Sequence, residues 1–192
     1  MPFSLALLVY RDVSYNMNPE TELKRICKNC NGVFEHEDYK VGGEIGSFVH
    51  ISKYRLKILY KNFNMNILYD FGNSDTAEFK IDKSNNQKIP EFEIKTIDHL
   101  SKLILFKKRN WDIKSADNLF KENIEYLIMK LNLNELIENT TFELNTFGKQ
   151  KNEKYSIRTV FSLKYEKNTE SAESIINFHK GLIDLITRKY CS

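Results

Sequence analysis

The chain contains few of the residues on which small stapled scaffolds depend. Its 192 residues include only three cysteines, three prolines, seven glycines and one tryptophan. A small, odd number of cysteines does not form the disulfide framework of a secreted protein, and it favours a reducing compartment. Charged residues interrupt every apolar run before it reaches membrane-spanning length, so we expect no membrane contact. No Pro-rich, Ser-rich or low-complexity linker divides the sequence, and we therefore expect one globular domain over residues 1–192.

The composition is that of a folded protein. Hydrophobic residues make up 41% of the chain, aromatic residues 12% and charged residues 29%, which is too apolar and aromatic for a disordered protein. A chain of this length buries about 70% of its unfolded surface, enough for a core without disulfides or metals. The abundance of Lys, Asn and Ile, with little Gly and Pro, suggests a bacterial source. Together these features predict a soluble protein of the bacterial cytoplasm.

The first apolar segment, "FSLALLVY", resembles the hydrophobic part of an export signal. It lacks a basic segment before it and a small-residue cleavage site after it, and the chain becomes charged at Arg11 and Asp12. We therefore expect a core strand or buried segment here rather than an export signal.

Three segments have the periodicity and the end signals of amphipathic helices. In the first, Asn18 can cap the helix and Pro19 occupies the opening position. In the second, Asp117 is the expected N-cap, and the third ends in Arg188 and Lys189, which suit the negative end of a helix dipole. The predicted helices cover about residues 18–31, 117–131 and 169–189.

Other segments alternate apolar and polar residues, which is the pattern of strands with one buried face. In the clearest case Tyr54, Leu56 and Ile58 alternate with Arg55 and Lys57. Short turns between consecutive strands allow only antiparallel pairing. We therefore predict an α+β fold: a mostly antiparallel sheet with about three helices packed on one face, and an element order that suggests two pseudo-similar halves. The predicted strands are residues 54–61, 63–71, 77–81, 91–95, 141–147 and 155–166. Residues 97–115 stay ambiguous between a short helix that leads into a strand and one longer strand.

Cys27 and Cys30 have the CxxC spacing of a metal site or a redox pair. With Leu23 and Ile26 they fall on one helical stripe, so we expect both thiols to be buried as small apolar residues. Their place near the helix C-terminus disfavours a thiolate, which argues against redox chemistry. Zinc binding would recruit His36 and a fourth ligand such as Asp38 or His50, but no second ligand pair accompanies the first.

No recognised catalytic motif occurs in the chain. The run "FEHED" around His36 is expected to be a solvated turn that leads into the glycine-rich "VGGEIG". His179 lies on an apolar stripe, where a core histidine is the simpler interpretation. We therefore expect no catalysis, no cofactor and no metal. The alternative is an enzyme whose site is assembled from distant residues around His36, His50 or His179.

A group of basic residues is the best candidate for a binding surface. Basic residues are expected to project from one strand face, with a second basic cluster beside an aromatic residue, and we predict that this surface binds a partner. A protein partner is the first interpretation, as for an accessory, adaptor or immunity-type protein, and the oligomeric state is open. Nucleic acid is the alternative, although a net charge of +3 is low for a dedicated nucleic-acid domain. The predicted partner-binding residues are Lys53, Arg55, Lys57, Lys61, Lys107, Lys108, Arg109 and Trp111.

Overall fold

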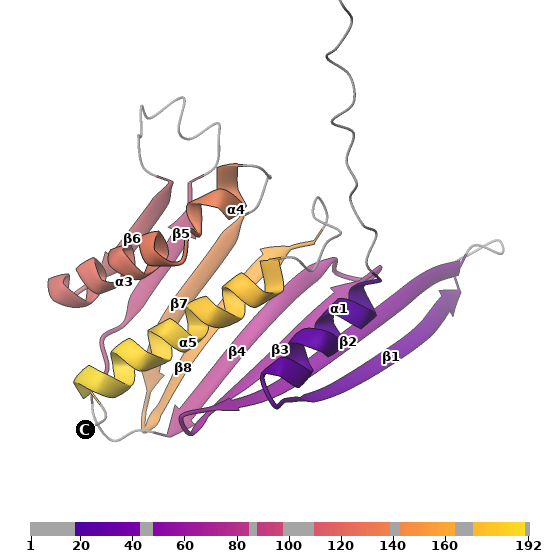
Figure 1. Cartoon of the computed structure of the whole chain (residues 1–192), viewed down its shortest axis with the longest axis horizontal. Coiled ribbons are helices and arrows are strands. Elements are labelled where there is room, and N and C mark those ends of the chain that lie inside the picture. Colours follow the sequence, from indigo (N-terminus) through magenta and orange to yellow (C-terminus); the bar gives the residue numbers. More distant parts are fainter. Residues whose placement is uncertain are drawn as a thin grey trace, which may run out of the picture.

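The computed structural model describes residues 18–42, 48–84, 88–97, 110–138, 143–163 and 171–190. These residues form one eight-stranded antiparallel sheet with four helices, and three long helices lie across the same face of the sheet (Figure 1). The helices are α1 (Pro19–Asn29), α3 (Asn118–Lys130), α4 (Asn134–Glu138) and α5 (Ser171–Tyr190). The strands are β1 (Val33–Gly42), β2 (Phe48–Tyr60), β3 (Phe63–Phe71), β4 (Thr76–Ser84), β5 (Phe92–Thr96), β6 (Trp111–Ser115), β7 (Leu144–Lys151) and β8 (Lys154–Ser162).

The strand order across the sheet is β1, β2, β3, β4, β8, β7, β5, β6, and every pairing is antiparallel. The predicted α+β class with an antiparallel sheet and helices on one face is therefore confirmed. The first four strands, which follow one another in the sequence, form one half of the sheet, and the later four form the other half. Within the described ranges, none of the helices combines the length and the apolarity that crossing a membrane requires.

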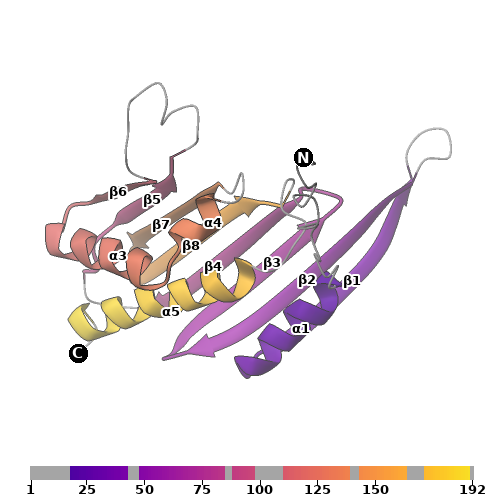
Figure 2. The ribbon, with the colours of Figure 1, turned by 45° about the horizontal axis from the view of Figure 1, so that its top comes forward.

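The core lies between the sheet and the helices. Tyr54, Leu56 and Ile58 of β2 point into it and are 7%, 0% and 3% exposed, as the alternation predicted. The apolar stripes of α1 and α5 contribute to the same core, with Leu23 and Ile176 among the buried residues. The opposite face of the sheet carries no described helix (Figure 2). We call it the open face.

The helix ends follow the predicted signals. The Asn18 side chain accepts a hydrogen bond from the N–H of Glu20, and Pro19 opens α1. The Asp117 side chain accepts from the N–H of Phe120 at 2.9 Å and caps α3. These caps fix where each helix begins over the sheet.

The predicted turn at "FEHED" is wrong, because these residues lie in the middle of the edge strand β1. The alternation was hard to see because the positions facing the helices are Phe34, His36 and Asp38, and only the first of these is apolar. Backbone pairing with β2 makes these residues a strand, although their side chains do not show the alternation of apolar and polar residues that is typical of one. The apolar segment at residues 3–10 lies outside the described residues.

A charged open face as the candidate interaction surface

The open face of β1 and β2 carries a cross-strand array of ion pairs. Lys57 Nζ lies 2.5 Å from Glu35 Oε1, and Arg55 donates to Glu37. In the strand register Glu35 stands directly opposite Arg55, so both ion pairs run diagonally between neighbouring positions of the same face. The cations of β2 are therefore matched by carboxylates of the edge strand.

The array continues across the neighbouring strands. Lys53 Nζ of β2 lies 3.8 Å from the buried carboxylate of Asp70 in β3. Further along the sheet, Arg158 of β8 donates to Glu78 of β4. Because all these groups are on one face and alternate in sign, the face has many charges but little local excess of either sign.

A hollow of about 300 Å³ opens on this face between β2, β3 and β4. Its rim combines both signs of charge, and Leu68 provides an apolar contribution from the central strand. Leu68 is half-buried, although it lies on the side of the sheet without helices. The hollow is lined by Arg55, Leu56, Lys57, Asn66, Ile67, Leu68, Glu78 and Lys80.

A larger and more open hollow of about 740 Å³ lies at the far half of the sheet, between β5, β6, β7 and the start of α3. Its charges are also mixed, since Lys114 Nζ lies 3.5 Å from Glu93 Oε2. The smaller hollow is the better candidate site because two predicted binding residues, Arg55 and Lys57, line it.

Lys53, Arg55 and Lys57 lie together on the open face, but the structure corrects the placement of Lys61. Strand β2 ends at Tyr60, and Lys61 follows in the turn to β3 with a φ of 47°. Its ammonium lies 2.8 Å from Asp184 Oδ1 of α5, on the side of the sheet that bears the helices. The sequence alternation was extended one residue too far.

Trp111 does not join the basic surface either. It lies in β6, at the opposite edge of the sheet from β1, and packs against the core. Its Nε1–H donates to Asn134 Oδ1 at 2.8 Å, which ties β6 to α4. Three other predicted residues, Lys107, Lys108 and Arg109, lie outside the described residues.

His36 of β1 and His50 of β2 both approach Asp38, on the face of the sheet that bears the helices. The carboxylate of Asp38 lies 3.0 Å from His36 Nε2 and 3.8 Å from His50 Nε2, and Glu20 approaches His36 at 3.5 Å. A hydrogen bond from Ser52 lowers the pKa of Asp38, with a smaller contribution from His36.

His179 is completely buried in the core and stacks on Phe79 with ring centroids 5.1 Å apart. Loss of solvation lowers its pKa to about 4, and the bond to the Ile175 carbonyl offsets this only in part. It is therefore a neutral core histidine, as predicted, and it has no access to a substrate in solution.

The two cysteines differ from each other more than predicted. Cys27 is buried, and burial raises the pKa of its thiol, which opposes thiolate chemistry. Cys30 is only half-buried, because it is the C-cap of α1 rather than part of its stripe, and Lys180 Nζ lies 3.3 Å from its sulfur.

The structure does not bring together the ligands of the zinc alternative. His36 lies beside Glu20 at the start of α1, and the helical rise places Cys30 about 15 Å further along. Across the described part of the chain, no group of three or more His, Cys, Asp or Glu residues is arranged to hold a metal ion.

Comparison with known proteins identifies no relative. No protein-family model matches the chain, and no curated protein or solved structure matches it. The functional interpretation therefore depends on the site itself.

The binding residues predicted from the sequence include Arg55 and Lys57 of the hollow but not, among others, Leu68, Glu78 and Lys80. One signal was available, because Leu68 is the apolar exception among the polar outward positions of its strand. The other two could not be assigned to the hollow without knowing that β4 lies beside β3 in this register.

Proposed function

We propose that this chain is a non-enzymatic interaction protein that binds a protein partner on its open face, around the hollow between β2, β3 and β4. One observation carries the proposal: ion pairs of both signs surround a hollow that includes the apolar side chain of Leu68. Leu68 gives the hollow an apolar side chain among the surrounding charges.

The pairing of the cations favours protein over nucleic acid. Nucleic-acid affinity comes mainly from Lys and Arg that neutralise phosphates. Here Lys53, Arg55 and Lys57 each have a carboxylate nearby in Asp70, Glu37 and Glu35. A polyanion would have to compete with those carboxylates at every position.

A surface with both signs of charge suits a protein partner, because protein interfaces gain specificity from complementary patterns of charge around a less polar centre. In this proposal Arg55, Lys57, Glu78 and Lys80 select the partner, and Leu68 contributes the apolar contact at the centre. An accessory, adaptor or immunity-type role in the bacterial cytoplasm fits such a surface, since it acts by occupying a partner rather than by chemistry.

The histidines support a role without catalysis. His179 has no route to solvent, and His36 and His50 contact a carboxylate rather than a nucleophile. General base catalysis needs a base within reach of the proton it removes from a bound substrate.

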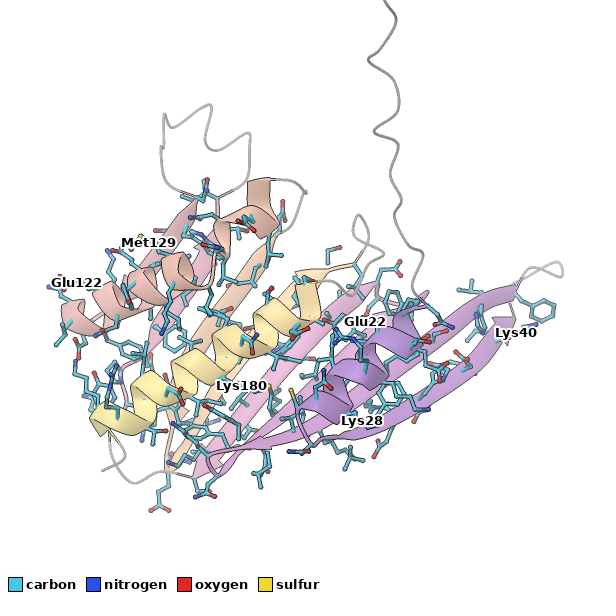
Figure 3. The ribbon with its side chains drawn as sticks, in the orientation of Figure 1. Glu22, Lys28, Lys40, Glu122, Met129 and Lys180 are labelled. Carbon is cyan, nitrogen blue, oxygen red and sulfur yellow. The ribbon has the colours of Figure 1, made fainter. Side chains whose placement is uncertain are left out.

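The test is affinity capture from the native cell with three baits: the wild-type chain, Leu68→Glu and Met129→Glu. Leu68→Glu puts a charge into the hollow, whereas Met129 is 61% exposed on α3 and receives the same charge on the other side of the sheet (Figure 3). We expect wild type and Met129→Glu to retain one protein in stoichiometric amount after nuclease treatment, and Leu68→Glu to lose it.

Two outcomes contradict the proposal. Loss of all captured material on nuclease treatment would favour the nucleic-acid alternative. Equal capture by Leu68→Glu and Met129→Glu would place the binding surface elsewhere. Circular dichroism of the three baits verifies that each is folded.

A further inference from the structure

Strand β1 forms one edge of the sheet and pairs on one side only. It is bonded to β2 over its ten residues, and Figures 1 and 2 show no other described element along its outer edge. Such an edge presents a row of backbone N–H and C=O groups that can pair with another strand. The residues from Glu37 to Gly42 are all exposed.

The sequence of this edge is complementary to itself in one antiparallel register. If Tyr39 of one chain stands opposite Tyr39 of another, Asp38 of each chain stands opposite Lys40 of the other. The next pairs are Glu37 with Val41 and His36 with Gly42. Paired residues lie on the same face of the sheet, so the Asp38 and Lys40 side chains meet twice, once on each side of the axis.

We propose that the chain forms a symmetric dimer through β1, with a twofold axis at Tyr39 perpendicular to the sheet. The two sheets then join into one continuous antiparallel sheet, and both open faces point to the same side. The partner is a second copy of this chain because the contact is isologous: each strand supplies the residues that the other requires.

Three features of the edge support this register. Lys40 is exposed at the far end of the hairpin and forms no ion pair with a described residue (Figure 3). Tyr39, Val41 and Val49, exposed by 39%, 46% and 51%, form an apolar group near the proposed axis. Gly42 has no side chain to collide with the facing His36.

Charged residues on an edge strand usually prevent pairing. Here their effect depends on the register, because opposite charges that face each other across strands attract and like charges repel. The registers centred on Asp38 or Glu37 bring two carboxylates together at the axis. The charges therefore disfavour those alternatives and favour the one centred on Tyr39.

The dimer does not depend on the partner proposed above, since β1 pairing uses the backbone edge and leaves the hollow open. A contact of seven residues per strand is at the small end of specific interfaces, so we expect a dissociation constant on the order of 10 µM. Sedimentation equilibrium of the full chain measures it directly.

Disulfide trapping tests the register. Directly opposed residues have Cα atoms about 4.5 or 5.5 Å apart, within the range that a disulfide bridges. Tyr39→Cys is therefore expected to give a covalent dimer under mild oxidation. Glu35→Cys is the matched control on the same strand and face, because the two copies of residue 35 lie about 27 Å apart in this register. The wild-type chain, with its native cysteines, gives the background.

A charge swap gives a second test that does not depend on cysteine chemistry. Lys40→Asp puts two carboxylates opposite each other on both sides of the axis, and we expect the dissociation constant to rise at least tenfold. The double variant Asp38→Lys with Lys40→Asp restores opposite charges and is expected to recover dimerisation.

A wild-type chain that stays monomeric well above the expected dissociation constant would overturn the dimer. Equal cross-linking of the Tyr39→Cys and Glu35→Cys variants would overturn the register. If the double variant does not fold, the cysteine pair still decides between the registers.

Discussion

Thr159 Oγ1 lies 2.7 Å from His179 Nε2 and joins β8 to α5 in the middle of the apolar core. The Ile175 carbonyl can only accept, so the proton of the neutral ring is on Nδ1, which donates to it at 2.7 Å. His179 Nε2 therefore accepts from the Thr159 hydroxyl, and Thr159 Oγ1 accepts from Thr146 at 2.8 Å. Every member of this buried chain of hydrogen bonds has a partner, which is the condition under which a polar network stabilises a core.

The first prediction concerns pH. The pKa of His179 is about 4 in the folded chain and about 6.5 in the unfolded chain, so between these values only the unfolded state binds the proton. Its contribution to stability is full above pH 6.5 and falls as the pH is lowered towards 4. At 1.36 kcal/mol per pKa unit the loss is about 3 kcal/mol. Urea unfolding of wild type and His179→Gln at both ends of this range measures it.

Paired carboxylates also titrate on acidification and change the stability of every variant. The contribution of His179 is therefore the difference between the pH dependence of wild type and that of His179→Gln. We expect His179→Gln to be less stable than wild type at neutral pH and to lose less stability on acidification. Parallel curves for wild type and His179→Gln would show that the buried ring does not control the acid response.

The second prediction concerns Asp117, which joins the start of α3 to the end of α5. Besides capping α3, it accepts from Lys189 Nζ at 2.9 Å and from the Tyr190 hydroxyl at 2.6 Å. Removing a cap and two bonds between helices with Asp117→Ala should lower the melting temperature by about 5 °C. Asp112→Ala removes a carboxylate from the open face of β6 and is expected to change it by less than about 1 °C.

The pH effect at this position has the same sign as that of His179, because both groups have a lower pKa in the folded chain than in the unfolded chain, but it begins only in stronger acid. The hydrogen bonds to Tyr190 and Lys189 hold the pKa of Asp117 well below its ordinary value of 3.8. Its stabilising contribution is therefore present above that value and is lost only as the pH falls further. The difference in melting temperature between wild type and Asp117→Ala should persist at pH 5 and shrink in stronger acid.

Much of the fold could be predicted because one face of each element is buried. Apolar residues therefore recur at every second position in strands such as β2 and β3, and with the helical period in α5. Strand β1 could not, since an edge strand with charged residues on both faces lacks that pattern. The charge balance of the site was also hidden. Arg55 and Lys57 meet carboxylates 18 and 22 residues earlier in the chain, and only the strand register brings them together.

The third prediction concerns the tight turn between β3 and β4. Gly72 has a φ of 85°, and a Cβ atom there would lie 2.1 Å from the backbone oxygen of His50. In Gly72→Ala the alanine has to adopt a strained positive φ, and its Cβ collides with the backbone of His50. We therefore expect a loss of at least about 2 kcal/mol in the free energy of unfolding. A Cβ on Gly42 makes only ordinary contact with the Phe48 ring at 3.6 Å. Gly42→Ala, measured at a concentration where the chain is monomeric, is the control that should remain near wild type.

The last prediction tests whether Glu35 and Glu37 neutralise the cations of the open face. Their replacement by glutamine in one double variant leaves Lys57 and Arg55 free to contact phosphate or sulfate groups. On a heparin column this variant should elute at clearly higher salt than wild type. Glu122→Gln with Glu153→Gln makes the same change in net charge at exposed positions on α3 and in the β7–β8 turn. If the two double variants elute together, total charge rather than cross-strand pairing governs polyanion binding, and the argument against nucleic acid loses its structural basis.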